Sequence, residues 1–169
     1  MENLEIRNIQ ELELDDFSRA MSVLPWHRDS SLYSQYIAEQ KQGKREFIIA
    51  ILDGQYVGHT CLIWDSKYYY FKEYGVPEIS DLLVLHQYQR QGIAKKLILH
   101  CEKLALSHSK QIGLGVGLYK DYAPAQNLYI NLGYRLDCQG ATTNYQPVTP
   151  GEMVKVDDDL VIWLIKDLK

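Results

Sequence analysis

The sequence lacks several features that mark particular classes of protein. No apolar run approaches the roughly 20 residues that a transmembrane helix needs, so no membrane partner is expected. Only three cysteines occur (Cys61, Cys101 and Cys138), without CxxC spacing, which argues against a disulfide framework or a zinc site. We therefore expect no metal. The acidic N-terminal segment is typical of neither a signal nor a transit peptide, and a cytoplasmic location is the default expectation.

Internal repeats, low-complexity segments and Pro- or Ser-rich linkers are also missing. The 169 residues fit one domain with one sizeable core, and we expect residues 1–169 to form it. The net charge of −4 argues against a nucleic-acid partner and suits a cationic small substrate. Tyrosine is unusually common, with 13 residues. Several cluster in an expected loop at 66–77, where they either line a pocket or cover an edge of the core.

The chain does contain a regular succession of apolar patterns. Alternating or apolar runs predict strands at 4–9, 78–85, 112–118, 134–140 and 160–168, and helical spacing predicts helices at 11–21, 30–43, 92–110 and 123–133. Residues 45–65 predict two strands joined at Asp53-Gly54, a strong hairpin signal. The strand-helix-strand crossover in the middle requires a parallel pair. We expect an α/β (α+β) fold, with a mixed, mostly antiparallel sheet of about seven strands and helices on both faces.

The segment QRQGIA (89–94) raises a question about how a helix begins. A helix N-terminus presents about four unpaired backbone N–H groups and a partial positive charge. The residues from Gln89 to Gln91 offer no Ser, Thr or Asp cap, while Gly92 permits close backbone approach and Arg90 can add a charge-assisted contact. An external phosphate suits such a turn, although a strand-turn-helix with one glycine is also a common structural element. GLGVG (113–117) is no dinucleotide motif, because its glycines lie within a predicted strand.

QRQGIA resembles, at every defined position, the Q/R-x-x-G-x-G/A signature of the GNAT superfamily of acyl-CoA-dependent N-acetyltransferases. APAQNLYINLGYRL (123–136) resembles the family's later A-x-x-L-Y-x-x-x-G-F motif, with Tyr134 in place of Phe. The two motifs cover roughly residues 78–137 with their connecting elements, and the element order extends the resemblance over nearly the whole chain. Tyr122 departs from the Asn of many members. The resemblance implies a GNAT-like sheet with a splayed parallel pair at strands 4 and 5.

The resemblance also implies that acetyl-CoA is the co-substrate. In the family the glycine turn cradles the coenzyme's pyrophosphate, and the matching residues here are Gln89, Arg90, Gln91, Gly92, Ile93 and Ala94. The pantetheine arm pairs with the strand before the turn, which implies roles for the backbones of Leu83 and Leu85 and for the N–H of Val84 near the thioester oxygen. Tyr122 and Ala125 complete the implied coenzyme site. The glycine-rich strand 112–118 is nearly bare on one face, which permits the close approach of a backbone or a ligand.

Acetyl transfer to an amine needs a neutral nucleophile and a proton for the leaving thiolate. Tyr129 occupies the position of the family's general acid; the structural alternative is a core aromatic residue of the helix. For the base, Glu78 lies where some members carry a catalytic glutamate, and Asp81 is a carboxylate inside a strand, which needs a reason. A water chain with neither acid essential is the third interpretation. His59, in the middle of a strand, is assigned to packing.

The acceptor site is expected in the loop at 25–30 and in the segment at 66–77. Trp26, His27, Tyr69 and Tyr70 are its candidates, because aromatic rings stack on cations or cover apolar substrates. The strand 160–168 is apolar on both faces, so it is either fully buried or exchanged with a second subunit in a homodimer. The sequence does not identify the acceptor.

The leading interpretation is an acetyl-CoA-dependent N-acetyltransferase that acts by direct attack of a primary amine of a small molecule or peptide. The alternative from another class is a non-catalytic acyl-CoA-binding or regulatory protein on the same fold, against which the presence of Tyr129 argues. A nucleotide-binding domain would need a metal-binding residue after the turn, and Ala94-Lys95 supplies none.

Overall fold

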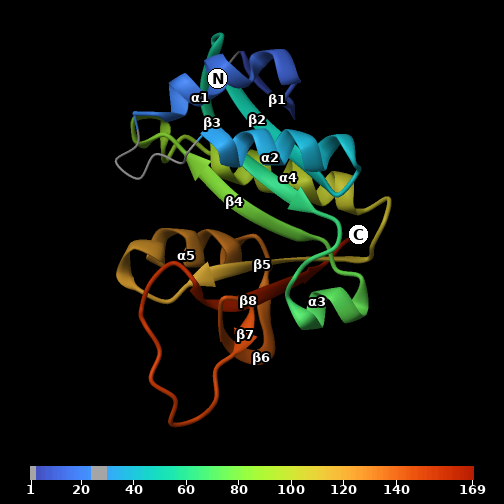
Figure 1. The fold of residues 1–169 in the computed structure, drawn as a ribbon, viewed down its shortest axis with the longest axis vertical. Coiled ribbons are helices and arrows are strands. Elements are labelled where there is room, and N and C mark those ends of the chain that lie inside the picture. The colour runs from blue at the N-terminus through green and yellow to red at the C-terminus, as the bar shows by residue number, and fades with distance from the viewer. Residues whose placement is uncertain (1–2, 24–29) are drawn as a thin grey trace. The chain divides into compact units, whose positions relative to one another are not determined.

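The computed structural model describes residues 3–23 and 30–169. Its strands are β1 (Leu4–Asn8), β2 (Arg45–Leu52), β3 (Gln55–Ile63), β4 (Glu78–Val84), β5 (Gln111–Gly117), β6 (Arg135–Thr143), β7 (Gln146–Pro147) and β8 (Leu160–Asp167). Its helices are α1 (Leu14–Met21), α2 (Ser30–Lys41), α3 (Tyr69–Tyr74), α4 (Ile93–Ala105) and α5 (Ala123–Asn131), with 3-10 turns η1 (Glu11–Glu13), η2 (His86–Tyr88) and η3 (Lys120–Tyr122). Figure 1 follows this succession from blue to red. Every strand and helix predicted from the sequence is present.

Two segments differ from the expectation. The tyrosine-rich stretch is not all loop, because it contains α3, which ends at Gly75 in the left-handed conformation with φ 63°. The helix forms because it buries Phe71, a tertiary contact that outweighs the modest helix propensity of aromatic residues. The stretch at 142–159, which the sequence left unassigned, contains β7, paired with the end of β6.

All eight strands belong to one sheet, in the order β1-β2-β3-β4-β5-β8-β6-β7. The pair β4–β5 is parallel, with Glu78 opposite Gly113 and Ile79 opposite Leu114. The pairs β1–β2, β2–β3, β5–β8, β6–β8 and β6–β7 are antiparallel. The predicted mixed, mostly antiparallel fold is therefore confirmed, and β7 is a short strand beyond those predicted.

The chain groups into two compact units, each described by itself below. Unit 1 comprises Met1–Ile63 and Ser80–Cys101, and unit 2 comprises Trp64–Ile79 and Glu102–Lys169. The strand β4 therefore contributes its first residues to unit 2 and the rest to unit 1. The interpretation of the chain as a single domain stays a prediction. Within the described ranges, no helix has the length and apolar character to cross a bilayer.

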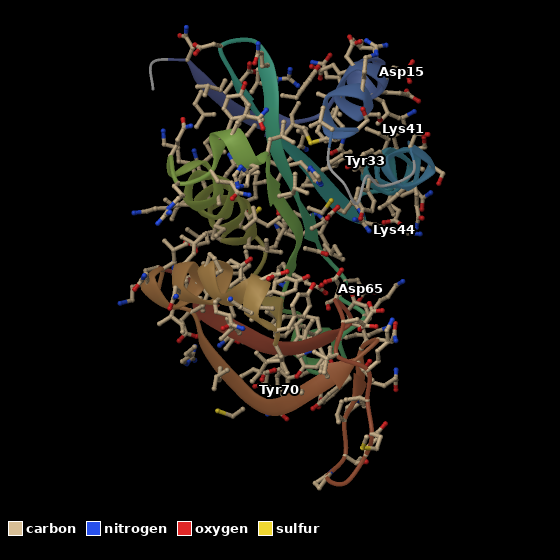
Figure 2. The ribbon with its side chains drawn as sticks, turned by 90° about the vertical axis from the view of Figure 1, so that its left-hand side faces the viewer. Asp15, Tyr33, Lys41, Lys44, Asp65 and Tyr70 are labelled. Carbon is tan, nitrogen blue, oxygen red and sulfur yellow. The ribbon has the colours of Figure 1, made fainter. Side chains whose placement is uncertain are left out.

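In unit 1 the strands lie between helices. Figure 2 shows α1 and α2 on one side of the strands and α4 on the other. The hairpin between β2 and β3 turns at Asp53 and Gly54, whose φ angles of 50° and 79° are those of the predicted tight turn. The space between α1, α2 and the strands is filled by rings, including Phe17, Phe47 and the labelled Tyr33 (Figure 2). This aromatic core surrounds one polar side chain, which becomes important below.

In unit 2 the helix α3 packs on β8. The ring of Tyr68 stacks on Trp163 with centroids 4.1 Å apart, and Phe71 joins the same buried cluster. A Cβ atom on Gly113 would lie 2.1 Å from the Phe71 ring, and one on Gly117 would lie 2.3 Å from the Tyr122 ring. The close approach expected at the glycines of β5 is therefore made, within this unit, by the chain's own aromatic side chains.

Candidate active site

The turn before α4 has the unusual backbone that its sequence suggests. Arg90 and Gly92 both have positive φ, at 60° and 80°. The side-chain amide of Gln89 donates to the carbonyl of Val84 at 3.0 Å, and that of Gln91 donates to the carbonyl of Gln87 at 3.3 Å. The side-chain N–H groups of both glutamines therefore stabilise the turn. In these two contacts neither side-chain oxygen caps the helix.

The start of α4 fits a phosphate group. The first backbone bond into the helix runs from the N–H of Lys96 to the carbonyl of Gly92, at 3.1 Å, so the N–H groups of Ile93 and Ala94 precede the helical ladder. The first turn carries no acidic residue that would repel an anion. No atom lies within 4 Å of where a Cβ of Gly92 would stand, so the backbone is open there. Backbone donors, a helix dipole and open space are the physical requirements of a phosphate cradle.

Asp81 occupies the most unusual position in β4. It is a non-glycine residue with φ 54° inside a strand, a conformation that costs of order 1–3 kcal/mol and persists only where the surroundings impose it. Its side chain is 4% exposed, and its Oδ2 atom accepts from the hydroxyl of Tyr36 and lies against Nε2 of His59, each at 3.2 Å. Unit 1 thus brings together a carboxylate, an imidazole and a phenol from three elements.

His59 was assigned to packing from the sequence, and that interpretation missed its partner. The side chain is fully buried, and its Nε2 atom faces Asp81. Its position in the middle of β3 gave no signal of the pairing, because the register between β3 and β4 is a tertiary property. Hydrogen bonding of Thr60 to the carbonyl of Ser80, at 3.0 Å, fixes that register within unit 1.

Glu78 begins β4 in unit 2 and has different surroundings. It is 3% exposed, and its Oε2 atom accepts from the hydroxyl of Ser66 at 2.5 Å, while Oε1 accepts from the hydroxyl of Tyr145 at 3.4 Å. Ser66 also accepts from the backbone N–H of Tyr68 at 3.0 Å, so the carboxylate helps to anchor the segment that leads into α3. Two hydroxyl donors compensate the burial of this carboxylate in the way a structural acceptor requires.

Tyr129 lies on α5 and is 7% exposed. Burial raises its pKa to about 12, so the hydroxyl keeps its proton at any pH near neutrality. The nearest ring in unit 2 is that of Tyr134, with centroids 6.2 Å apart. A buried phenol that stays protonated can hold a proton for a departing group, and it can equally be a core residue, so the predicted acid role stays a proposal.

The coenzyme residues predicted on β4 lie at its end in unit 1. Leu83 is half-buried and Val84 is buried. The backbone of Leu85 already bonds within the unit, because its N–H donates to the carbonyl of Val57 at 2.9 Å and its carbonyl accepts from Tyr88 at 2.8 Å. A role for this strand end in binding an extended ligand stays a proposal, and it rests on Leu83 and Val84.

The remaining predicted coenzyme residues lie in unit 2. The hydroxyl of Tyr122 donates to Asp158 at 2.9 Å, and burial, reinforced by that hydrogen bond, raises its pKa above the ordinary value. Ala125 follows on the first turn of α5. Tyr122 therefore has a structural role at the start of the helix, where it packs against Gly117 and ties in the segment that carries Asp158.

The predicted acceptor residues are only partly described. Trp26 and His27 lie outside the described residues. Tyr69 and Tyr70 lie on α3 in unit 2 (Tyr70 is labelled in Figure 2). The hydroxyl of Tyr69 donates to Gln139 at 3.3 Å, and the ring of Tyr70 lies 4.7 Å from that of Tyr74. Among residues 3–23 and 30–169, no group of three or more His, Cys, Asp or Glu side chains forms a candidate metal site.

Solved structures of acetyltransferases have a fold similar to that of this chain. A Desulfovibrio desulfuricans protein assigned to the GNAT family is 12% identical, with a TM-score of 0.71 over 98% of this chain and 99% of that one. A Salmonella typhimurium protein solved with its cofactor acetyl-CoA is 18% identical, with a TM-score of 0.69 over 99% and 95%. The NatB acetyltransferase complex bound to a bisubstrate inhibitor contains a chain that is 25% identical, with a TM-score of 0.68 over 97% and 90%.

Comparison of the sequence with curated proteins and with family models gives two different results. No curated protein matches the sequence. The family model described as "Acetyltransferase (GNAT) family" matches residues 6–134, a span that includes the turn, both β4 carboxylates and Tyr129. This match covers most of the chain, and the predicted resemblance is confirmed. The chain belongs to the GNAT family of acetyltransferases.

Proposed function

We propose that the protein is an acetyl-CoA-dependent N-acetyltransferase, acting by direct attack of a primary amine. The observation that carries the proposal is the uncapped turn of unit 1, with Gly92 at φ 80° and open space beside it, in a chain of the GNAT family. The Salmonella relative, of the same fold, binds acetyl-CoA. Acetyl-CoA, when bound, supplies the activated acetyl thioester.

In this proposal the residues from Gln89 to Ala94 bind the pyrophosphate. The backbone N–H groups at the start of α4 donate to phosphate oxygens, and Arg90 contributes a positive charge. The strand end at Leu83 and Val84 binds the extended arm through its backbone. Tyr122 and Ala125 at the start of α5 complete the set. These assignments come from the family motifs, and the open, uncapped turn at Gly92 supports the first of them.

Asp81 is the base that we propose. An amine that is protonated at neutral pH must lose a proton before it can attack a carbonyl, and a carboxylate can accept that proton. The strained backbone of Asp81 and its imidazole partner distinguish it from Glu78, whose two hydroxyl donors suit a structural role. Glu78 and a water chain remain the competing assignments, and the variants described in the Discussion separate them.

Tyr129 is the proton donor that we propose for the leaving thiolate. Its pKa of about 12 keeps the phenol protonated throughout the working range of pH. A phenol of this pKa is a weaker acid than a thiol, so its contribution in the proposal is to donate a hydrogen bond, and finally the proton, to the sulfur while charge develops there, and water restores the proton afterwards. Protonation by solvent is the competing route, and loss of the hydroxyl then slows the reaction without abolishing it.

The acceptor that we propose is a primary amine on a small molecule or a peptide. Aromatic candidates on α3, Tyr69 and Tyr70, and the candidates Trp26 and His27 would surround it. The NatB relative is bound to a bisubstrate inhibitor, which leaves peptide acceptors in the set to be screened. Action in the cytoplasm and assembly as a homodimer belong to the same proposal.

Calorimetric titration with acetyl-CoA, NAD and ATP tests the proposal first. We expect micromolar binding of acetyl-CoA alone. Gly92→Glu should weaken this binding at least tenfold, because it places a side chain and a negative charge in the open space of the turn. Gly43→Glu is a matched control, since Gly43 also has positive φ (68°), has no atom within 4 Å of a Cβ and lies away from the turn.

The two possible failures have different meanings. Equal affinity of wild type and a folded Gly92→Glu variant would remove the assignment of the turn. Tight binding of acetyl-CoA without acetylation of any amine in a panel of small amines and peptides would favour the non-catalytic acyl-CoA-binding alternative.

A further inference from the structure

His59 is poorly explained by packing alone. Its ring is surrounded by edge-on aromatic rings, with centroids 5.4 Å from Phe17, 5.6 Å from Tyr33 and 5.9 Å from Phe47. Its Nδ1 atom is buried and, among the described residues, has no hydrogen-bond partner. Leaving a buried polar atom unpaired costs about 1–3 kcal/mol. A phenylalanine would fill the same cage without this cost, so the imidazole has another reason to be there.

That reason lies on the other side of the ring. An ionised carboxylate only accepts hydrogen bonds, so Nε2 must carry the proton that it shares with Asp81. The neutral imidazole then leaves its acceptor atom, Nδ1, in the apolar cage. The hydroxyl of Tyr36 donates to the same Oδ2 atom. Two donors, from β3 and from α2, therefore stabilise the ionised and oriented form of Asp81.

Several elements of unit 1 bring described side chains around this pair. The elements packed around His59 bring Tyr33 and Tyr36 from α2, Cys61 from β3 itself, Asp81 from β4, and the uncharged rings Phe17 and Phe47 from α1 and β2. Arg45, a cation of unit 1, lies 4.1 Å over the Tyr36 ring and pairs with Glu39 at 2.6 Å.

We infer that His59 is a positioning residue that holds Asp81 ionised and oriented to take the proton of the acceptor amine. This inference rests on the proposed function. In the step, one N–H bond of the ammonium breaks and its electron pair stays on nitrogen, while the proton bonds to the Asp81 carboxylate. The charge of that side chain goes from −1 to 0, and the Nε2–H bond of His59 is kept. Tyr36 supports the same carboxylate through its hydroxyl.

Two substitutions separate positioning from packing. His59→Phe keeps a ring in the aromatic cage and removes the donor, and we expect kcat to fall about tenfold to a hundredfold, a share of the factor that proton transfer contributes. His59→Gln keeps an amide N–H donor for Asp81, and we expect it to recover most of that loss. The affinity for acetyl-CoA, measured by calorimetry, should match wild type in both variants. Thermal unfolding confirms that both are folded.

The pH profile gives a readout that packing would not move. Loss of a donor to the ionised carboxylate favours its protonated form, so the acid limb of kcat should shift to higher pH in His59→Phe. His59→Gln should show a smaller shift. His108→Gln, the same substitution at an exposed histidine of unit 2, is the control and should leave the profile unchanged. Identical profiles for wild type and folded His59→Phe would overturn the inference.

NMR of the free protein tests the pair without any catalysis. With the five histidines isotopically labelled, His59 is assigned from the signal lost in His59→Gln. We expect its Nε2-protonated tautomer, and a changed nitrogen shift in Asp81→Asn. A His59 signal identical in wild type and Asp81→Asn would overturn the pairing. A wild type that binds acetyl-CoA but acetylates no amine would overturn the proposed function and this inference with it, whereas an active His59→Phe with the wild-type rate would overturn this inference alone.

Discussion

Glu78 and Asp81 belong to the same strand, and both carboxylates are almost completely buried, yet their surroundings differ in kind. Glu78, in unit 2, accepts from the hydroxyls of Ser66 and Tyr145. Asp81, in unit 1, has a left-handed backbone and lies against an imidazole. The hydroxyl of Tyr36 also donates to Asp81, so the feature that Glu78 lacks in these contacts is the ring nitrogen of His59. The comparison teaches that burial alone does not distinguish the two carboxylates of one strand; their partners and their backbone conformations do.

The largest expected effect is a difference in kcat between variants of these two carboxylates. Asp81→Asn preserves size and removes the negative charge, and we expect kcat to fall about a thousandfold, within the range that general base catalysis contributes. Glu78→Gln should leave kcat near the wild-type value. Steady-state kinetics at saturating acetyl-CoA measures both, with circular dichroism as the check on folding. The opposite ranking would assign the base to Glu78, and two active variants would favour the water chain.

The second-largest effect concerns Tyr129, which differs from the other buried tyrosine near a proposed catalytic group, Tyr36. Tyr36 donates to a carboxylate in unit 1, whereas for Tyr129 in unit 2 burial alone raises the pKa. If Tyr129 protonates the leaving thiolate, Tyr129→Phe should lower kcat about a hundredfold and leave acetyl-CoA affinity unchanged. A wild-type rate in Tyr129→Phe would instead support its role as a core residue, with solvent as the proton source.

The same tyrosine predicts a dependence of stability on pH. Below pH 10 its hydroxyl is neutral in the folded and the unfolded chain, so burial contributes no pH dependence there. Between pH 10 and about 12 the unfolded chain loses the proton first, and the free energy of unfolding falls. We expect this fall, relative to Tyr129→Phe, to reach about 2 kcal/mol near pH 12. Denaturant unfolding of wild type and Tyr129→Phe at pH 8 and pH 11.5 measures it. An equal change in the free energy of unfolding of the two proteins between these pH values would show that the hydroxyl is solvated.

The smallest effect concerns the hydroxyl that holds Glu78. Ser66→Ala removes one donor from a buried carboxylate and should lower the free energy of unfolding by about 1–3 kcal/mol. Because we assign Glu78 to structure, kcat at a permissive temperature should stay close to wild type. A fall in kcat without a loss of stability would contradict that assignment and would sharpen the case for Glu78 as the base.

Local sequence signals predicted much of the fold and part of the candidate site. The hairpin at Asp53-Gly54 and the turn at Gly92 depend on backbone preferences that are properties of the residues themselves, so both were predictable. The helix α3 was missed because its stability comes from burying Phe71 rather than from helical periodicity. Tyr122 departs from the family's Asn, and only the structure shows its bond to Asp158.

The sequence by itself determined the family, the order of strands and helices, and the uncapped turn before α4, because these depend on neighbours within a few residues. Only the tertiary structure decided which carboxylate of β4 meets an imidazole. That choice depends on the register of β3 against β4 and on the left-handed backbone of Asp81. A shift by one residue would turn His59 to the other face of the sheet, and no local preference of the chain fixes that shift.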